Sequence, residues 1–255
     1  MIEFFKECDK SAVVSLWSKT FGDSTQWIEK YLSYFAEFVA VYKENNELLG
    51  MLSLLPVQAD KYCGRYVYAV ATDKKARGMG IATKLLEFAK DFIKEKNEDF
   101  LVLVPSEASL FDFYQKRGYT TLNCIEKSEF LITQKRDILS CFEKISPQEY
   151  CDFRQKHLKG FRQISWDSDS LEKILALYNG DFYYSKSTDS IAFCVNDKNT
   201  LYIKEFLSSD TSPDFLSLAS FYDANTIVLT KKGDKPFAMV YPESFKNSYF
   251  NIAID

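Results

Sequence analysis

Two glycines and an arginine stand where a short apolar segment gives way to an amphipathic one. Residues 66–72 are β-branched and aromatic, which favours a strand, and residues 81–93 repeat apolar side chains at helical spacing. Between them, Gly78 and Gly80 let the backbone approach a ligand closely, and the first turn of the helix offers unpaired amides. The helix dipole and the Arg77 guanidinium favour negative charge there. This pattern indicates a diphosphate site, with an ordinary tight connection as the alternative.

A second segment supplies a hydroxyl that could act as an acid. Residues 100–104 are continuously apolar and predict a buried strand that ends at Pro105. A helix is expected to start at Ser106 and to end at Gly118, because glycine suits the left-handed position that follows a helix. Tyr114 lies on this helix, four residues before the glycine. Its phenol is either a proton donor to a reacting group or one more packed aromatic side chain.

Both segments match motifs of one superfamily. Residues 77–82 (Arg-x-x-Gly-x-Ala) resemble the acetyl-CoA diphosphate motif of the GNAT superfamily of acetyltransferases, which begins with glutamine or arginine and ends with glycine or alanine. Residues 114–119 (Tyr-Gln-Lys-Arg-Gly-Tyr) resemble the Tyr-x-x-x-Gly-Phe ending of the next helix of that superfamily. The two motifs occur in the expected order, with the expected elements between them. The resemblance covers the first half of the chain by motif and the second half by topology.

The resemblance implies that acetyl-CoA is the co-substrate of this chain. The end of the strand would pair with the pantetheine arm, one of its amides would polarise the thioester carbonyl, and the glycine turn would hold the diphosphate. Tyr114 would be the general acid that faces the CoA sulfur. The predicted cofactor contacts are Val70, Ala71, Thr72, Arg77, Gly78, Met79, Gly80, Ile81, Ala82 and Ser109, although Ser109, like Ser106, alternatively only caps its helix.

The acceptor that the resemblance implies is a primary amine on a small or medium-sized molecule or a peptide. It is expected between the two halves of the chain, over the helices around Trp27 and Tyr31. Aromatic rings and a carboxylate suit a cationic amine that also carries apolar surface, although packing onto the sheet alone would explain each ring. The rings are Phe21, Trp27, Tyr31, Tyr34 and Phe35, with Asp23 and Glu29 as the acids. The general base stays open among Tyr66, Tyr68, a relayed water, Asp23, Glu29 and Glu107.

The predicted fold class is α+β, an α/β sandwich. A GNAT fold at residues 1–135, with a mixed, mostly antiparallel central sheet flanked by helices, would bind acetyl-CoA and carry the catalysis. Its expected strands are residues 2–7, 39–42, 48–55 with an extension at 57–61, 66–72, 100–104 and a pair within 120–133, and its expected helices are 9–22, 23–35, 81–93 and 106–118.

Residues 136–255 repeat this order more faintly and predict a second, degenerate GNAT-like domain. Where the first half has Arg-Gly-Met-Gly, residues 208–213 contain no glycine, and Asp210 would repel a diphosphate. We therefore expect no CoA site in this half, with an unrelated α+β cap domain as the alternative. The expected strands are 138–145, 182–185, 191–196, 201–207, 226–230 and 237–241, and the expected helices are 146–158, 169–178 and 212–222.

An active-looking GNAT half followed by a degenerate one resembles the Eis-like aminoglycoside acetyltransferases. Those enzymes have a third, sterol-carrier-like domain, for which 255 residues leave no room, so aminoglycosides are not carried over as the expected substrate. Two other functions stay open. One is aminoacyl transfer from tRNA by a tandem GNAT protein, against which the acidic balance and the CoA motif weigh. The other is a non-catalytic acetyl-CoA sensor or partner-binding protein.

Composition excludes several other classes of function. The net charge of −4 argues against nucleic acid as the main partner. No apolar run reaches the length of a membrane span, and the first residues lack a basic signal-peptide start, so a cytoplasmic protein without a membrane partner is expected. The six cysteines form no Cys-x-x-Cys pair, and no metal site is expected. His157 is the only histidine, which sets the Ser-His-Asp and Cys-His hydrolases aside, and the oligomeric state stays open.

Overall fold

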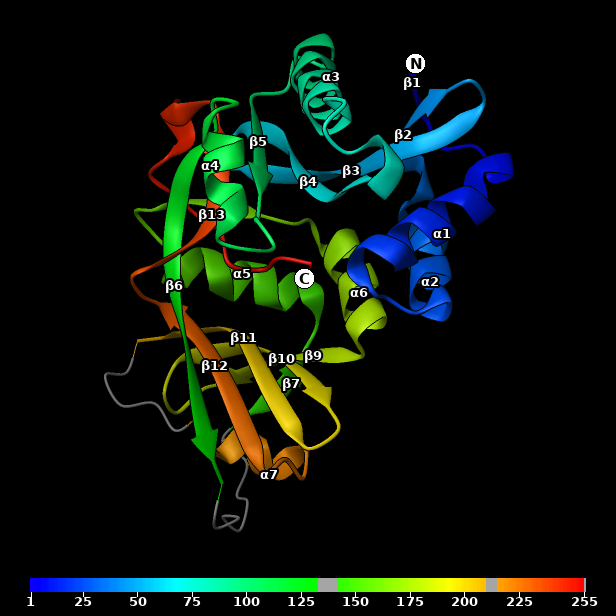
Figure 1. Cartoon of the computed structure of the whole chain (residues 1–255). Coiled ribbons are helices and arrows are strands. Elements are labelled where there is room, and N and C mark those ends of the chain that lie inside the picture. The colour runs from blue at the N-terminus through cyan, green and yellow to red at the C-terminus, as the bar shows by residue number, and fades with distance from the viewer. Residues whose placement is uncertain (133–141, 210–214, 255) are drawn as a thin grey trace. The chain divides into compact units, whose positions relative to one another are not determined.

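The computed structural model describes residues 1–132, 142–209 and 215–254 (Figure 1). Two compact units are formed, the first by Met1–Thr120 with Met239–Lys246 and the second by Thr121–Ala238 with Asn247–Asp255. Several features that the sequence predicts lie outside the described residues. They are the domain boundary at residue 135, the strand start at residue 138, the helix start at residue 212, and Asp210. The division into domains 1–135 and 136–255 stays a prediction.

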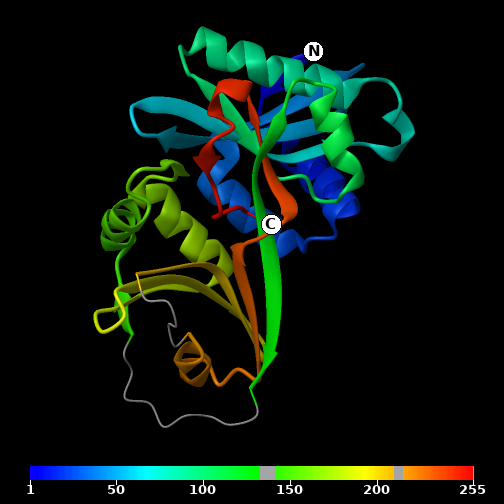
Figure 2. The ribbon, with the colours of Figure 1, turned by 90° about the vertical axis from the view of Figure 1, so that its left-hand side faces the viewer.

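The first unit is built on a mixed sheet. Its strands are ordered β1-β2-β3-β4-β5-β13. The pairs β1–β2, β2–β3, β3–β4 and β5–β13 are antiparallel, and β4 and β5 are parallel. Figures 1 and 2 show α1 and α2 on one face of this sheet and α3 on the other. The strands are β1 Ile2–Phe4, β2 Val39–Glu44, β3 Glu47–Ala59, β4 Tyr62–Thr72, β5 Phe100–Leu103 and β13 Lys235–Tyr241. The helices are α1 Lys10–Phe21, α2 Thr25–Phe35, α3 Ile81–Glu95 and α4 Ser109–Gln115.

Local signals place the first three helices where the sequence predicts them. Gly22 ends α1 in the left-handed conformation, with a φ of +84°. The hydroxyl of Ser24 accepts a hydrogen bond from the amide of Trp27 and so caps the start of α2. These helices are confirmed, and so is the apolar stripe of α3, which buries Ile81, Leu85, Leu86, Ala89 and Ile93.

The fourth helix begins three residues later than predicted. The sequence predicts a start at Ser106, but the amide of Leu110 donates to the carbonyl of Glu107 at 3.1 Å. This bond closes a tight turn of three residues, which precedes the α-helical bonding pattern. Ala108 is the N-cap residue and has no side-chain acceptor, so α4 starts at Ser109.

The second unit has a sheet ordered β6-β12-β11-β10-β9-β7, antiparallel apart from the parallel β11 and β12. Its strands are β6 Thr120–Leu131, β7 Glu143–Ile145, β9 Gly180–Ser185, β10 Ser190–Asp197, β11 Thr200–Ser208 and β12 Thr226–Lys232. A parallel pair is formed by β8 Arg162–Ser165 and β14 Ser248–Tyr249. The helices are α5 Pro147–His157, α6 Ser168–Tyr178 and α7 Ser217–Phe221.

Three details of the second unit correct the prediction. β6 is one continuous strand and not a pair, because residues 125–131 pair without interruption with β12. α6 begins before the predicted cap at Asp169, because the carboxylate of Asp167 accepts a hydrogen bond from the amide of Ser170 at 2.7 Å. β8 is an unpredicted strand, since its partner β14 is two residues long and far along the chain.

The predicted fold class, a mixed sheet flanked by helices, is confirmed. Within the described residues, no helix combines the length and the apolar character that crossing a bilayer requires.

Candidate active site

A bulge and the end of the pairing with β5 distinguish the last residues of β4 in the sheet of the first unit. β4 pairs with β5 only as far as Val67 and Leu103. The register between β4 and β3 shifts between Met51 and Ser53, and Ala69 takes a φ of +50°, which is strained for a residue with a side chain. The last residues of β4 therefore extend past the described pairing with β5. An extended ligand can pair with that edge of the strand.

The helix that follows β4 begins with free amides. Gly80 is the N-cap residue of α3, with a φ of +74°, and its carbonyl accepts the first intrahelical bond from the amide of Lys84 at 3.0 Å. The amides of residues 81–83 therefore have no acceptor within the helix. Gly78 also has a positive φ of +83°, and a Cβ at either glycine would meet no heavy atom within 4 Å. The space in front of the turn is open, and the left-handed backbone explains why glycine stands at both positions.

A pocket of about 360 Å³ lies where β4, α3 and α4 meet. It brings together the free helix amides, the arginine of the first motif and the tyrosine of the second. The lining residues are Val70, Thr72, Ala76, Arg77, Gly78, Gly80, Ile81, Ala82, Thr83, Leu110, Phe113, Tyr114 and Arg117.

The tyrosine that lines this pocket holds its proton at neutral pH. Tyr114 is almost completely buried, with 7% of its surface exposed. Burial raises the pKa of its phenol to about 12, and the nearby Arg117 guanidinium opposes that rise. The phenol is therefore available as a hydrogen-bond donor over the whole neutral pH range.

Arg117 is a second guanidinium at the pocket, at a position that the motifs leave unspecified. Its Nε and Nη2 donate to Oγ1 of Thr83 at 3.0 and 2.6 Å, and its Nη1 donates to the carbonyl of Phe113 at 2.6 Å. The signal for it in the sequence is its spacing. Arg117 stands three residues after Tyr114, and in the predicted helix 106–118 that spacing puts the two side chains on the same face.

The match to a known family covers the residues that build this pocket. Residues 3–119 match the model of the Acetyltransferase (GNAT) family. The chain carries a GNAT acetyltransferase domain. The resemblance carried by the two motifs is thereby confirmed, and so is the predicted enzyme type, a GNAT-type N-acetyltransferase. Acyl transfer is the reaction class of the family.

Solved structures share the fold of the chain at low sequence identity. A GCN5-related N-acetyltransferase from Kribbella flavida is 11% identical with a TM-score of 0.68, over 94% of this chain and 70% of that one. A putative acetyltransferase from Pyrococcus horikoshii is 12% identical with a TM-score of 0.65, over 99% and 94%. Eis1 from Mycobacterium abscessus is 10% identical with a TM-score of 0.61, over 92% and 66%. These likenesses show the fold alone, and no curated protein matches the sequence.

In the GNAT domain, most of the predicted cofactor contacts lie around the pocket. Ala71 does not line it, because alternation along β4 turns its side chain into the core, where 1% of the residue is exposed. Met79 is 55% exposed and also lies outside the lining, and Ser109 donates a hydrogen bond to Glu107. The predicted contacts that do line the pocket are Val70, Thr72, Arg77, Gly78, Gly80, Ile81 and Ala82.

Of the three carboxylates considered as general bases, Asp23 is the one that lies against the aromatic side chains of α1 and α2. Its Oδ2 accepts a hydrogen bond from Nε1 of Trp17 at 2.8 Å, and the Trp17 ring lies 5.9 Å from that of Trp27 between centroids. Glu29 lines a different surface groove beside α1, and Glu107 is exposed at the start of α4. Asp23 is therefore placed beside the aromatic side chains, whereas Glu29 and Glu107 lie elsewhere on the surface.

The two predicted acceptor contacts have different surroundings. Trp27 is half-buried, so part of its surface is accessible. Tyr31 is 0% exposed, and its ring is stacked on Trp27 at 5.8 Å and packed against Trp17 at 4.8 Å and Tyr68 at 5.7 Å between centroids. A ring without accessible surface offers no contact to a ligand. Tyr31 therefore packs against Trp27 and does not itself contact the acceptor.

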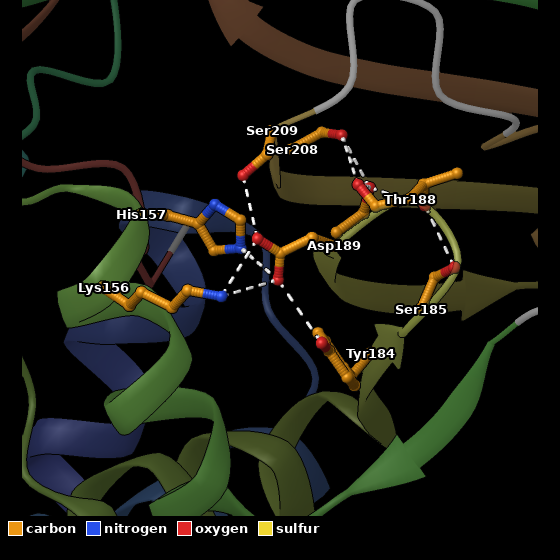
Figure 3. Close-up of polar contacts among 9 residues, drawn as sticks. Lys156, His157, Tyr184, Ser185, Thr188, Asp189, Ser208 and Ser209 are labelled. Atoms are coloured by element: carbon orange, nitrogen blue, oxygen red, sulfur yellow. Dashed lines mark hydrogen bonds and ion pairs between the residues drawn. The ribbon is translucent and has the colours of Figure 1, made fainter.

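The lone histidine belongs to a polar cluster of the second unit (Figure 3). Asp189, in the turn between β9 and β10, accepts hydrogen bonds from Lys156 at 3.0 Å, from the hydroxyl of Ser209 at 2.9 Å and from Tyr184 at 3.3 Å. Nε2 of His157 lies 3.8 Å from Oδ1 of Asp189 and has no hydrogen-bond partner among the described residues. In a Ser-His-Asp relay the histidine stands between the other two residues. Here the aspartate stands in the middle, so the cluster is not such a relay.

Burial of this histidine makes the stability of the second unit depend on pH. The side chain of His157 is 5% exposed, and desolvation lowers its pKa below 6.5, although Asp189 acts in the opposite direction and Lys156 adds to the lowering. The folded unit therefore binds a proton less readily than the unfolded chain, whose histidine has a pKa of about 6.5. The stability that the neutral ring confers is present above that pH and is lost as the pH falls towards the folded pKa.

We expect His157→Gln to lose less stability than the parent when the pH falls from about 7.5 to about 5.5. The free energy of unfolding from urea titrations at the two pH values measures this difference. Because the chain has a single histidine, no other imidazole contributes. Equal losses in the parent and the variant would show that His157 titrates in the folded unit as it does in the unfolded chain.

Proposed function

We propose that the GNAT domain transfers the acetyl group of acetyl-CoA to a primary amine of a small or medium-sized acceptor. The observation that carries this proposal is the pocket in which the free amides of α3, the Arg77 guanidinium and the Tyr114 phenol come together. The pocket suits a diphosphate, because the glycines leave open space at the positive end of a helix of 15 residues. Acetyl-CoA supplies an acyl group that is already activated as a thioester.

Each part of the pocket has a role in this proposal. The amides of residues 81–83 and Arg77 hold the diphosphate, and the backbone of residues 70–72 pairs with the pantetheine arm. The amine attacks the carbonyl carbon in its neutral form, so that a C–N bond forms while the C–S bond breaks, and the nitrogen gives up one proton to solvent. Tyr114 acts as the general acid, donating to the sulfur as negative charge develops there.

The acceptor is proposed to bind where Asp23 and Trp27 flank the aromatic side chains of α1 and α2. Tyr68 lies between this region and the proposed pantetheine site. It is on β4, two residues before Val70, and its ring lies 5.7 Å from that of Trp17 between centroids. An ammonium group suits the carboxylate of Asp23, and the apolar part of the acceptor suits the indole face of Trp27. The acceptor class is therefore a cationic amine with apolar surface.

Turnover of acetyl-CoA by the full chain tests the proposed activity. The acceptors are a panel of small amines, peptides and aminoglycosides, and the released CoA thiol is measured. The expected result is transfer to at least one class of amine, with the acetylated product identified by mass spectrometry. Tight binding of acetyl-CoA without transfer to any member of the panel would instead favour a non-catalytic acetyl-CoA sensor.

Asp23→Asn should raise the KM for the amine about tenfold and leave the KM for acetyl-CoA unchanged. An asparagine still accepts the hydrogen bond from Trp17 but no longer attracts an ammonium group, and one charge-assisted contact of about 1.5 kcal/mol corresponds to about tenfold. Glu29→Gln is the control, because it removes an exposed acid of α2 that lines a different groove. If both KM values rise together in Asp23→Asn, Asp23 maintains the fold of the domain and does not bind the acceptor.

A further inference from the structure

Arg117 is held in place at the edge of the pocket by contacts from two helices. Oγ1 of Thr83 on α3 accepts hydrogen bonds from its Nε and Nη2, and the carbonyl of Phe113 on α4 accepts one from its Nη1. The guanidinium also lies over the Phe113 ring, 3.5 Å from the centroid. Lys90, a buried residue of α3, donates from Nζ to the carbonyl of Arg117 at 2.7 Å and so fixes its backbone. These contacts fix the orientation of the Arg117 side chain.

This position is unfavourable for a cation that has no counter-ion. Thr83 is the third residue of α3, so the guanidinium bound to it lies at the positive end of the helix. Arg77 lines the same pocket, and Lys84 adds a further positive charge in the first turn of α3. None of the ion pairs between described residues joins Arg117 to a carboxylate. An anion in the pocket would replace these repulsions by attraction.

The hydrogen bonds of Arg117 leave the end of its guanidinium available. A guanidinium carries five N–H groups, and Thr83 and Phe113 use three of those on Arg117. One N–H on each terminal nitrogen remains. Arginine can contact two oxygens of one phosphate group with one N–H from each terminal nitrogen.

We infer that Arg117, positioned by Thr83, binds a phosphate group of the CoA nucleotide and makes the domain select CoA over fragments that lack phosphate. The inference rests on the proposed function, because it takes acetyl-CoA to be the ligand of the pocket. The phosphate is either part of the diphosphate or the 3′-phosphate of the ribose. Both present the same chemistry to a guanidinium, and fragments of CoA distinguish them.

Calorimetry on the full chain tests this role with Arg117→Met and a matched control. Lys116→Met is the control, because it removes an exposed positive charge from the preceding residue at the same end of α4. We expect Arg117→Met to weaken CoA binding about 10- to 100-fold, as the loss of charge-assisted hydrogen bonds predicts, and Lys116→Met to stay within about twofold of the parent. Arg117→Lys keeps the charge but not this pair of N–H groups and should fall between them. Pantetheine, which has no phosphate, should bind equally to all four proteins.

Two nucleotide fragments identify the phosphate. ADP has the diphosphate but no 3′-phosphate, whereas adenosine 3′,5′-bisphosphate has the 3′-phosphate but no diphosphate. Selective loss of ADP binding by Arg117→Met would assign Arg117 to the diphosphate, and selective loss of bisphosphate binding would assign it to the 3′-phosphate.

An arginine with a purely structural role would give a different result. Its loss would lower the Tm and weaken the binding of CoA and of pantetheine to the same extent. That outcome, or CoA binding by Arg117→Met within about twofold of the parent, would overturn the inference and leave the proposed function standing. Failure of the parent protein to bind CoA at all would overturn the proposed function itself.

Discussion

Gly80→Asp should abolish acetyl-CoA binding and leave the protein folded. A Cβ at this position meets no heavy atom within 4 Å, so the added carboxylate lies in the open space of the pocket in front of α3. At an effective dielectric constant of about 20, a unit charge about 5 Å from a phosphate charge costs about 3 kcal/mol, which alone weakens binding more than 100-fold. A diphosphate carries two such charges and needs the volume that the side chain occupies. We therefore expect a loss of about 1000-fold or more.

Gly22→Asp is the matched control for this substitution. Gly22 has nearly the same left-handed backbone, with a φ of +84° against +74°, and its Cβ also meets open space, but it ends α1 and does not line the pocket. Aspartate in this conformation costs about 1 kcal/mol at either site, so both variants should lose similar stability. Calorimetry with acetyl-CoA should separate them, because the control keeps the affinity of the parent. Parent-like affinity in Gly80→Asp would show that the turn does not hold the diphosphate.

The phosphate turn and its helix could be predicted because their determinants are local. Gly78, Gly80 and the periodic apolar residues that follow fix the turn, the start of α3 and its buried face within about 16 residues of sequence. The cap at Ser24 and the glycine at the end of α1 are local signals of the same kind. The local sequence specifies elements of this type, and tertiary contacts select only their orientation.

The remainder of the site depends on contacts that no short pattern encodes. The bulge at Ala69 follows from a register shift against β3, and the fixed position of Arg117 requires Thr83, which is 34 residues away in the chain. Burial in three dimensions also separates Asp23 from Glu29, although the sequence offers both as acids on neighbouring turns. No short pattern predicts the place of β13 either. This strand comes from near the other end of the chain and joins the sheet of the first unit by pairing with β5.

Tyr114→Phe should lower kcat about 100-fold and leave acetyl-CoA binding nearly unchanged. Burial raises the pKa of the phenol to about 12, well above the pKa of about 8.5 of a thiol, so complete transfer of the proton to a free thiolate is uphill. The phenol therefore acts mainly through a hydrogen bond that strengthens as charge develops on the sulfur. One such donor in a water-excluded site contributes about 10²–10³-fold, at the lower end of the range for general acids. The phenol of Tyr114 should also add no ionisation of its own to the pH profile between about pH 6 and 9.

Tyr119→Phe is the control that separates this role from packing. The ring of Tyr119 lies 5.9 Å from that of Tyr114 in the same core, and its buried hydroxyl has no hydrogen-bond partner among the described residues. Removal of an unpaired buried hydroxyl should leave stability unchanged or raise it, and kcat should remain that of the parent. Single-turnover measurements at saturating acetyl-CoA isolate the chemical step from product release. If that step in Tyr114→Phe stays within about twofold of the parent, as in Tyr119→Phe, then Tyr114 is a packed aromatic residue and another group supplies the proton.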